Sequence, residues 1–105
     1  MDVDTSNLDE TVVFHKQRMK SCRAAIKDLE SRIRKYDNLI SRGGDGYDVD
    51  SLESSNDHAR QQIGRFQQEI SSSQTQVANT NKMREFLEKK AMIAEGITID
   101  ANAND

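Results

Sequence analysis

The chain has 105 residues and a net charge of −3, with 34% hydrophobic residues, 31% charged residues, no Trp and no Pro. This composition argues against a compact globule, because an average soluble domain is richer in apolar residues and poorer in charge. An elongated helical protein needs one apolar stripe per helix, and it fits these proportions better. The absence of Pro also removes the strongest helix breaker from every position.

The cysteine and histidine content excludes several kinds of site. Cys22 is the single cysteine, and His15 and His58 lie far apart, so no internal disulfide can form and we expect no zinc site. Residues 1–10 are acidic and lack the basic and apolar blocks of a signal peptide. No apolar run approaches the ~20 residues of a membrane-spanning helix. We therefore expect a cytoplasmic protein (in the host cytoplasm if it is viral) without a membrane partner.

A first helix is predicted over residues 8–42, after an acidic N-terminal arm at residues 1–7. Ser6 or Asn7 is expected to cap its start. Its apolar positions recur in alternating steps of four and three, which is the heptad seam of a left-handed coiled coil. The seam consists of Leu8, Val12, His15, Met19, Cys22, Ile26, Leu29, Ile33, Tyr36 and Ile40.

A tip rich in glycine and aspartate, over residues 43–50, separates this helix from a second one. Its three glycines are the strongest break in the chain. The second helix is predicted over residues 51–95, with Asp48, Asp50 or Ser51 at its start and a capping-box spacing after Asp50. Residues 96–105 are expected to form a flexible tail.

The second helix repeats the seam with smaller and more polar occupants. From Met83 to Ala94 the apolar face becomes broader, and we expect its phase to shift. The earlier seam positions are Leu52, Asn56, Ala59, Ile63, Phe66, Ile70, Ser73, Val77 and Thr80.

The short link between the helices forces them to fold back on each other. The predicted fold is therefore all-α, a two-helix antiparallel coiled-coil hairpin. Pairing Ile40 with Leu52 places Val12 near residue 80, so residues 86–97 extend beyond the first helix. Two helices also bury little surface per residue, and for both reasons we expect the hairpin to oligomerise or to bind a partner.

A row of basic residues follows one outer face of the first helix. Such a row could follow a phosphate backbone, since each cation that neutralises a phosphate releases counterions. The alternative is a solvated face that pairs with acids of the second helix or of a second subunit. The candidate nucleic-acid face consists of Lys16, Lys20, Arg23, Lys27 and Arg34.

The tip has an acidic group formed by Asp45, Asp48 and Asp50. Capping and solvation explain these acids more simply than calcium binding, because the order of ligands in an EF-hand loop is missing. An acidic tip on a coiled-coil hairpin resembles the fingers of Gre-type transcript-cleavage factors, which enter the secondary channel of RNA polymerase. Residues 44–48 and 56–62 are loosely similar to that tip. The resemblance implies a polymerase-binding hairpin.

The turn at residues 42–50, between a basic helix and a second helix, also resembles the phage recombination mediator that loads recombinase on single-stranded DNA. This resemblance is one of pattern, and it implies a nucleic-acid-binding accessory factor. Neither resemblance transfers a functional residue to this chain.

A cluster late in the second helix is a candidate docking patch for another protein, because Met adapts to irregular partners. The alternative is that it packs against residues 1–14, including Val12, Val13 and Phe14. His15 is expected to be a packed seam residue and Cys22 an ordinary small apolar one. The patch consists of Met83, Phe86, Met92 and Ile93.

No motif for catalysis occurs in the sequence: it has no phosphate-binding glycine loop and no nucleophile beside a base. A two-helix rod also lacks the concave pocket that an enzyme needs. We expect no cofactor and no small-molecule substrate. The leading hypothesis is a non-enzymatic coiled-coil interaction protein, meaning an adaptor, assembly factor or chaperone-like accessory subunit, with a composition that would suit a phage or viral protein. The alternatives are a nucleic-acid-binding accessory factor in recombination or transcription and the polymerase-binding hairpin.

Overall fold

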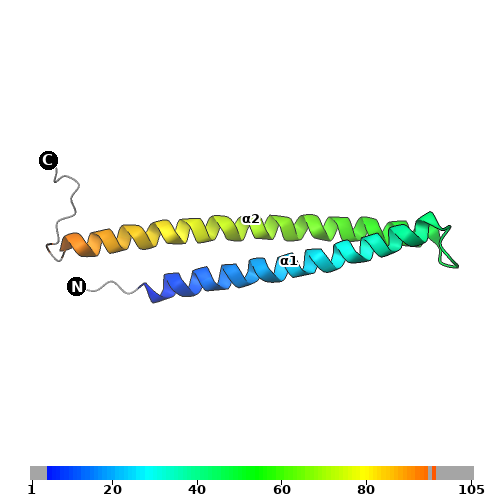
Figure 1. The fold of residues 1–105 in the computed structure, drawn as a ribbon. Coiled ribbons are helices and arrows are strands. Elements are labelled where there is room, and N and C mark those ends of the chain that lie inside the picture. Colours follow the sequence, from blue (N-terminus) through cyan, green and yellow to red (C-terminus); the bar gives the residue numbers. More distant parts are fainter. Residues whose placement is uncertain (1–4, 95, 97–105) are drawn as a thin grey trace.

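Two long antiparallel helices form the molecule. A computed structural model describes residues 5–94 and residue 96. Helix α1 (Ser6–Ser41) and helix α2 (Val49–Ala94) lie side by side along a rod with extents of 75 × 28 × 14 Å (Figure 1). The radius of gyration is 23.6 Å, whereas a compact domain of this length would have a value near 13 Å. The predicted all-α helical hairpin is confirmed.

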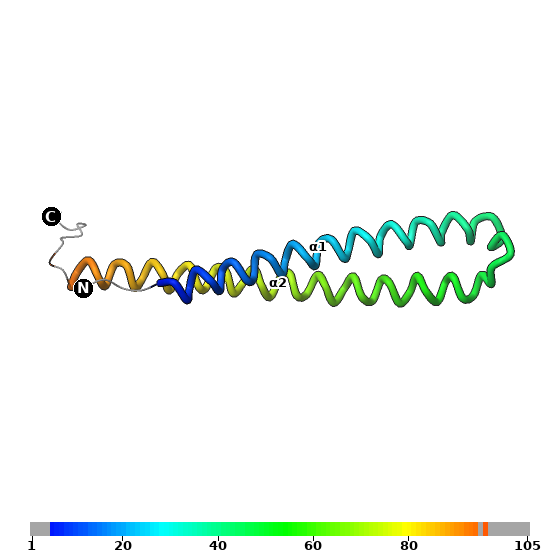
Figure 2. Tube along the Cα trace, turned by 90° about the horizontal axis from the view of Figure 1, so that it is seen from below, coloured from blue at the N-terminus to red at the C-terminus, as the bar shows by residue number. Residues whose placement is uncertain are grey.

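The two helices wind around each other. At the start of α1 the helices lie apart in Figure 1 and overlap in Figure 2. Near the tip they overlap in Figure 1 and lie apart in Figure 2. This change along the rod is what a heptad seam requires, because a 3.5-residue repeat keeps one stripe facing the partner only if the helices supercoil. Val12, Met19 and Cys22 are buried in α1, and every other seam position of that helix is half-buried.

The seam of α2 continues with one phase to the end of the helix. Arg84, Leu87 and Ala91 follow Thr80 in steps of four, three and four, and all three are half-buried. The expected change of phase after Met83 is therefore wrong. Met83 and its apolar neighbours form a separate exposed stripe beside the seam. The stripe and the seam together made the apolar face look broader in the sequence.

The helix starts differ in detail from the expectations. α1 begins at Ser6 with Thr5 at the cap position, so neither Ser6 nor Asn7 caps the helix as predicted. α2 begins at Val49, and Asp48 caps it: its carboxylate accepts hydrogen bonds from the Asp50 amide (3.2 Å) and the Ser51 hydroxyl (2.9 Å). Most of the predicted arm and of the C-terminal tail lies outside the described residues.

The tip reverses the chain through consecutive left-handed residues. Gly43, Gly44, Asp45 and Gly46 have φ values of 78°, 92°, 48° and 91°. The Gly44 amide donates to the Leu39 carbonyl at 2.7 Å, which closes the end of α1. A β-carbon on Gly44 would lie 2.5 Å from the Tyr47 carbonyl oxygen, so this position needs glycine for space as well as for its φ value.

Replacing Gly44 tests how strictly the tip sets the reversal. Gly44→Ala should lower the free energy of unfolding by at least about 2 kcal/mol, because it adds a backbone clash to the left-handed penalty. Gly43→Ala is the matched control: a β-carbon there meets nothing within 4 Å, so it should cost about 1 kcal/mol. Urea unfolding followed by circular dichroism measures both values. Equal losses would contradict the steric argument.

Candidate functional site

Polar contacts near both ends of α1 identify one edge of the seam. Near the tip, the Asn56 amide donates to Asp37 at 2.9 Å, and Arg60 lies 3.9 Å from the same carboxylate. At the other end, Arg84 pairs with Asp9. Asp9 and Asp37 differ by four heptads, so they have the same heptad position on α1, and this edge runs the length of the hairpin.

The candidate nucleic-acid face lies along this same edge. Lys16 and Arg23 stand seven and fourteen residues after Asp9, and therefore share its heptad position. Lys20, Lys27 and Arg34 each follow an edge position by four residues. They form a second row beside the edge, further from the seam. The structure thus places Lys16, Lys20, Arg23, Lys27 and Arg34 on one exposed surface, the basic row.

The side chains of the basic row make no salt bridge with any other residue that the structure describes. Arg18, at the opposite edge, behaves differently: it donates a hydrogen bond to Glu69 at 2.8 Å. This hydrogen bond raises the pKa of the Arg18 guanidinium above its ordinary value. Among the α2 acids, Glu69 pairs with Arg18 and Asp57 with Arg60, and none forms a salt bridge with the basic row.

The acids of the tip have structural partners. Asp48 caps α2, and Asp45 pairs with Arg42 at 3.1 Å. Asp50 lies in the first turn of α2, where a carboxylate stabilises the positive end of the helix dipole. The tip thus gathers the three predicted acids, and two of them interact with neighbouring residues.

The candidate docking patch is exposed but not continuous. Met83, Phe86 and Ile93 have exposed fractions of 50%, 59% and 66%. Their spacing of three and seven residues places them on one stripe, the apolar stripe, whereas Met92 is rotated from Phe86 by about 120° around the helix. Met92, 40% exposed, therefore stands apart from the other three.

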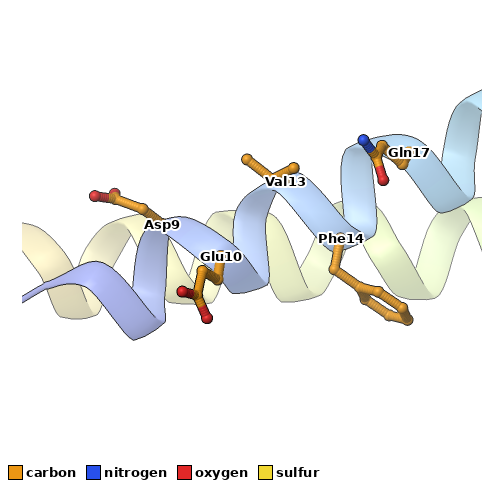
Figure 3. A pocket seen from close by; sticks show the side chains of 5 residues that line it. All are labelled: Asp9, Glu10, Val13, Phe14 and Gln17. Atoms are coloured by element: carbon orange, nitrogen blue, oxygen red, sulfur yellow. The ribbon is translucent and has the colours of Figure 1, made fainter.

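The alternative covering of this patch by the start of α1 does not occur among the described residues. Val12 is buried in the seam, but Val13 and Phe14 are 53% and 59% exposed. Figure 3 shows Val13 and Phe14 projecting to opposite sides of α1, with α2 behind the helix. They border a groove of about 370 Å³ whose lining comes from α1 alone: Asp9, Glu10, Val13, Phe14 and Gln17.

Polar side chains occupy three buried positions of the α2 seam, namely Asn56, Ser73 and Thr80. His15 Nδ1 and Ser73 Oγ share a hydrogen bond at 3.2 Å, so His15 is a packed seam residue as predicted. His58 is exposed, and Cys22 is buried as a free thiol.

Within residues 5–94 and 96, no group of His, Cys, Asp or Glu side chains is arranged to hold a metal ion. Neither α1 nor α2 is apolar enough to cross a membrane. Comparisons with protein-family models, curated proteins and solved structures give no match. The resemblances noted at the tip therefore stay predictions.

Asn56 offers a test of the polar seam. Its side chain is 1% exposed, and its Oδ1 has no hydrogen-bond partner. Asn56→Leu should raise the free energy of unfolding by about 1 kcal/mol, because it removes an unsatisfied buried acceptor that costs about 1–3 kcal/mol. The lost bond costs little in comparison, since the Asp37 carboxylate is half-exposed and water can replace the Asn56 amide. The adjoining groove of about 300 Å³ gives the larger side chain room.

The matched control is Asn79→Leu, the same substitution at an exposed position of α2. It should change the unfolding free energy by less than about 0.5 kcal/mol. Urea unfolding of the two variants and the parent protein gives the comparison. A loss of stability in Asn56→Leu would mean that its bond to Asp37 outweighs the unpaired oxygen.

Proposed function

We propose that the protein is a non-enzymatic coiled-coil interaction protein that pairs with a second copy of itself through the open end of the hairpin. The open end is the end opposite the tip, where α2 extends beyond the start of α1 (Figure 1). The exposed apolar stripe, which runs from Met83 and Phe86 to Ile93 in this extension, is the observation that supports the proposal.

The pairing of Asp9 with Arg84 fixes how far α2 extends. Since α1 begins three residues before Asp9, its first residue lies level with about residue 87, and residues 88–94 extend roughly 10 Å further. Ile93 of the apolar stripe, 66% exposed, lies in this segment. A helix with an apolar side and no neighbouring helix is stabilised by covering that side.

A second copy fits this segment because its charges run from acidic to basic. Glu85 and Glu88 precede Lys89 and Lys90. Glu85 and Lys89 flank the apolar stripe on the same side, so Glu85 of one chain lies beside Lys89 of the other if two copies overlap with their α2 ends antiparallel. The same patch then faces itself across a two-fold axis, which gives a closed dimer and not an open filament.

The apolar stripe supplies the buried core of this interface. In the antiparallel overlap, Phe86 of one copy lies near Ile93 of the other. An aromatic side chain in a well-packed centre is the usual energetic anchor of an interface. The overlap is short, so we expect a modest affinity compared with interfaces that bury about 800 Å² on each partner.

Light scattering after size exclusion tests the pairing. The chain mass is 11.9 kDa, and the parent protein should show twice that mass at high concentration. Phe86→Ser combined with Ile93→Ser should return the mass to that of one chain, because it removes the apolar anchor on both sides of the interface.

Tyr47→Ser is the matched control. Tyr47 is 64% exposed, but it lies at the tip, at the far end of the rod. Its loss should leave the dimer intact. A parent protein that stays monomeric at every concentration, or equal dissociation by both sets of substitutions, would refute pairing through the open end.

A further inference from the structure

The middle of the hairpin has a charge opposite to that of the whole chain. Residues 11–27 of α1 contain Lys16, Arg18, Lys20, Arg23 and Lys27 and no acid. The facing part of α2, residues 61–81, contains one residue of each sign, Arg65 and Glu69. The middle therefore has a net charge of +5, within a chain whose net charge is −3.

The α2 side chains beside the basic row are neutral. Arg60 marks the edge of the seam that the basic row follows, and residues seven and fourteen further along share its heptad position. These are Gln67 and Gln74. The outer positions next to them are equally uncharged, so the strip beside the basic row consists of Gly64, Gln67, Ser71, Gln74 and Ala78.

The acids nearest to this surface lie at its ends, and they include Glu85 and Glu88, which continue the α2 strip beyond Ala78. Glu30 shares the heptad position of Arg23 and separates Lys27 from Arg34. Asp9 lies beyond Lys16 and is paired with Arg84. The uninterrupted part of the basic row is thus Lys16 to Lys27, which spans roughly 16 Å of helix.

We propose that this surface binds the phosphate backbone of a nucleic acid. Lys and Arg side chains neutralise phosphates, while Ser and Gln side chains donate hydrogen bonds to phosphate oxygens, and here both kinds lie next to each other. No aromatic side chain occurs among the exposed residues of the two strips, so stacking on bases is not available. Binding is therefore independent of sequence.

Two other anionic partners fit this surface less well. A helix that binds anionic lipid inserts an apolar face along its basic one. Here the α2 neighbours of the basic row are Gln, Ser, Gly and Ala residues, and the exposed apolar residues Val13 and Phe14 lie at one end of the row. An acidic protein would need carboxylates spaced along a rigid surface. A nucleic acid presents phosphates at regular intervals along each strand, about one per 3.4 Å of duplex axis, so a short row of cations can find phosphates at any position along it without further specificity.

Fluorescence anisotropy tests the proposal as salt rises from about 50 to 200 mM. The probes are a labelled mixed-sequence duplex of about 20 base pairs and one of its strands. The affinity should fall steeply with salt. Lys20→Gln combined with Lys27→Gln should weaken binding at least about tenfold and reduce the slope of log K against log salt by about two. Gln has nearly the helix propensity of Lys, and circular dichroism should show an unchanged helix content.

Lys35→Gln combined with Arg65→Gln is the matched control. It removes the same charge from exposed positions that lie about 100° around their helices from the basic row and from the neutral strip beside it, and it should change Kd less than about threefold. Three results would overturn the proposal: no binding by the parent protein at low salt, an equal loss in both double variants, or equally tight binding to a polyglutamate peptide or to phosphatidylserine vesicles. None of the substituted residues lies in the proposed dimer interface, so both double variants should keep the oligomeric state of the parent protein.

Discussion

One seam between two helices of unequal length holds the whole structure together. Each helix has a single neighbour, so only some seam residues are buried, at both ends of the hairpin as well as around Met19 and Cys22, and the others stay half-exposed. The hydrophobic contribution scales with the area removed from water, and a two-helix rod removes little. Its stability therefore depends strongly on the tip, which holds the helices in register.

The two proposed interactions use different parts of this rod. The open end offers apolar side chains in a short extension of α2, whereas the middle offers cations beside neutral polar residues. Pairing through the open ends would double the length of the rod and leave both basic rows uncovered. Each row would then contact phosphates independently, and linking two weak sites raises the overall affinity without a new contact.

Most of the fold could be predicted from local features. The regular steps of the first seam and the glycines of the tip predict a hairpin, because both act within a few residues of chain. The contact between Asp37 and Asn56 could not be predicted in the same way, since it depends on the exact register of two helices. The same limit affected the prediction of the docking patch. Periodicity alone could not separate the seam residues Leu87 and Ala91 from the exposed stripe beside them.

The position of Cys22 has a practical consequence. Its thiol is buried at the centre of the seam and is the single cysteine of the chain. An alkylating reagent can reach it only when the helices separate locally, and such local opening has its own free energy. The rate of thiol modification therefore reports how often the hairpin opens at its midpoint, without any engineered label.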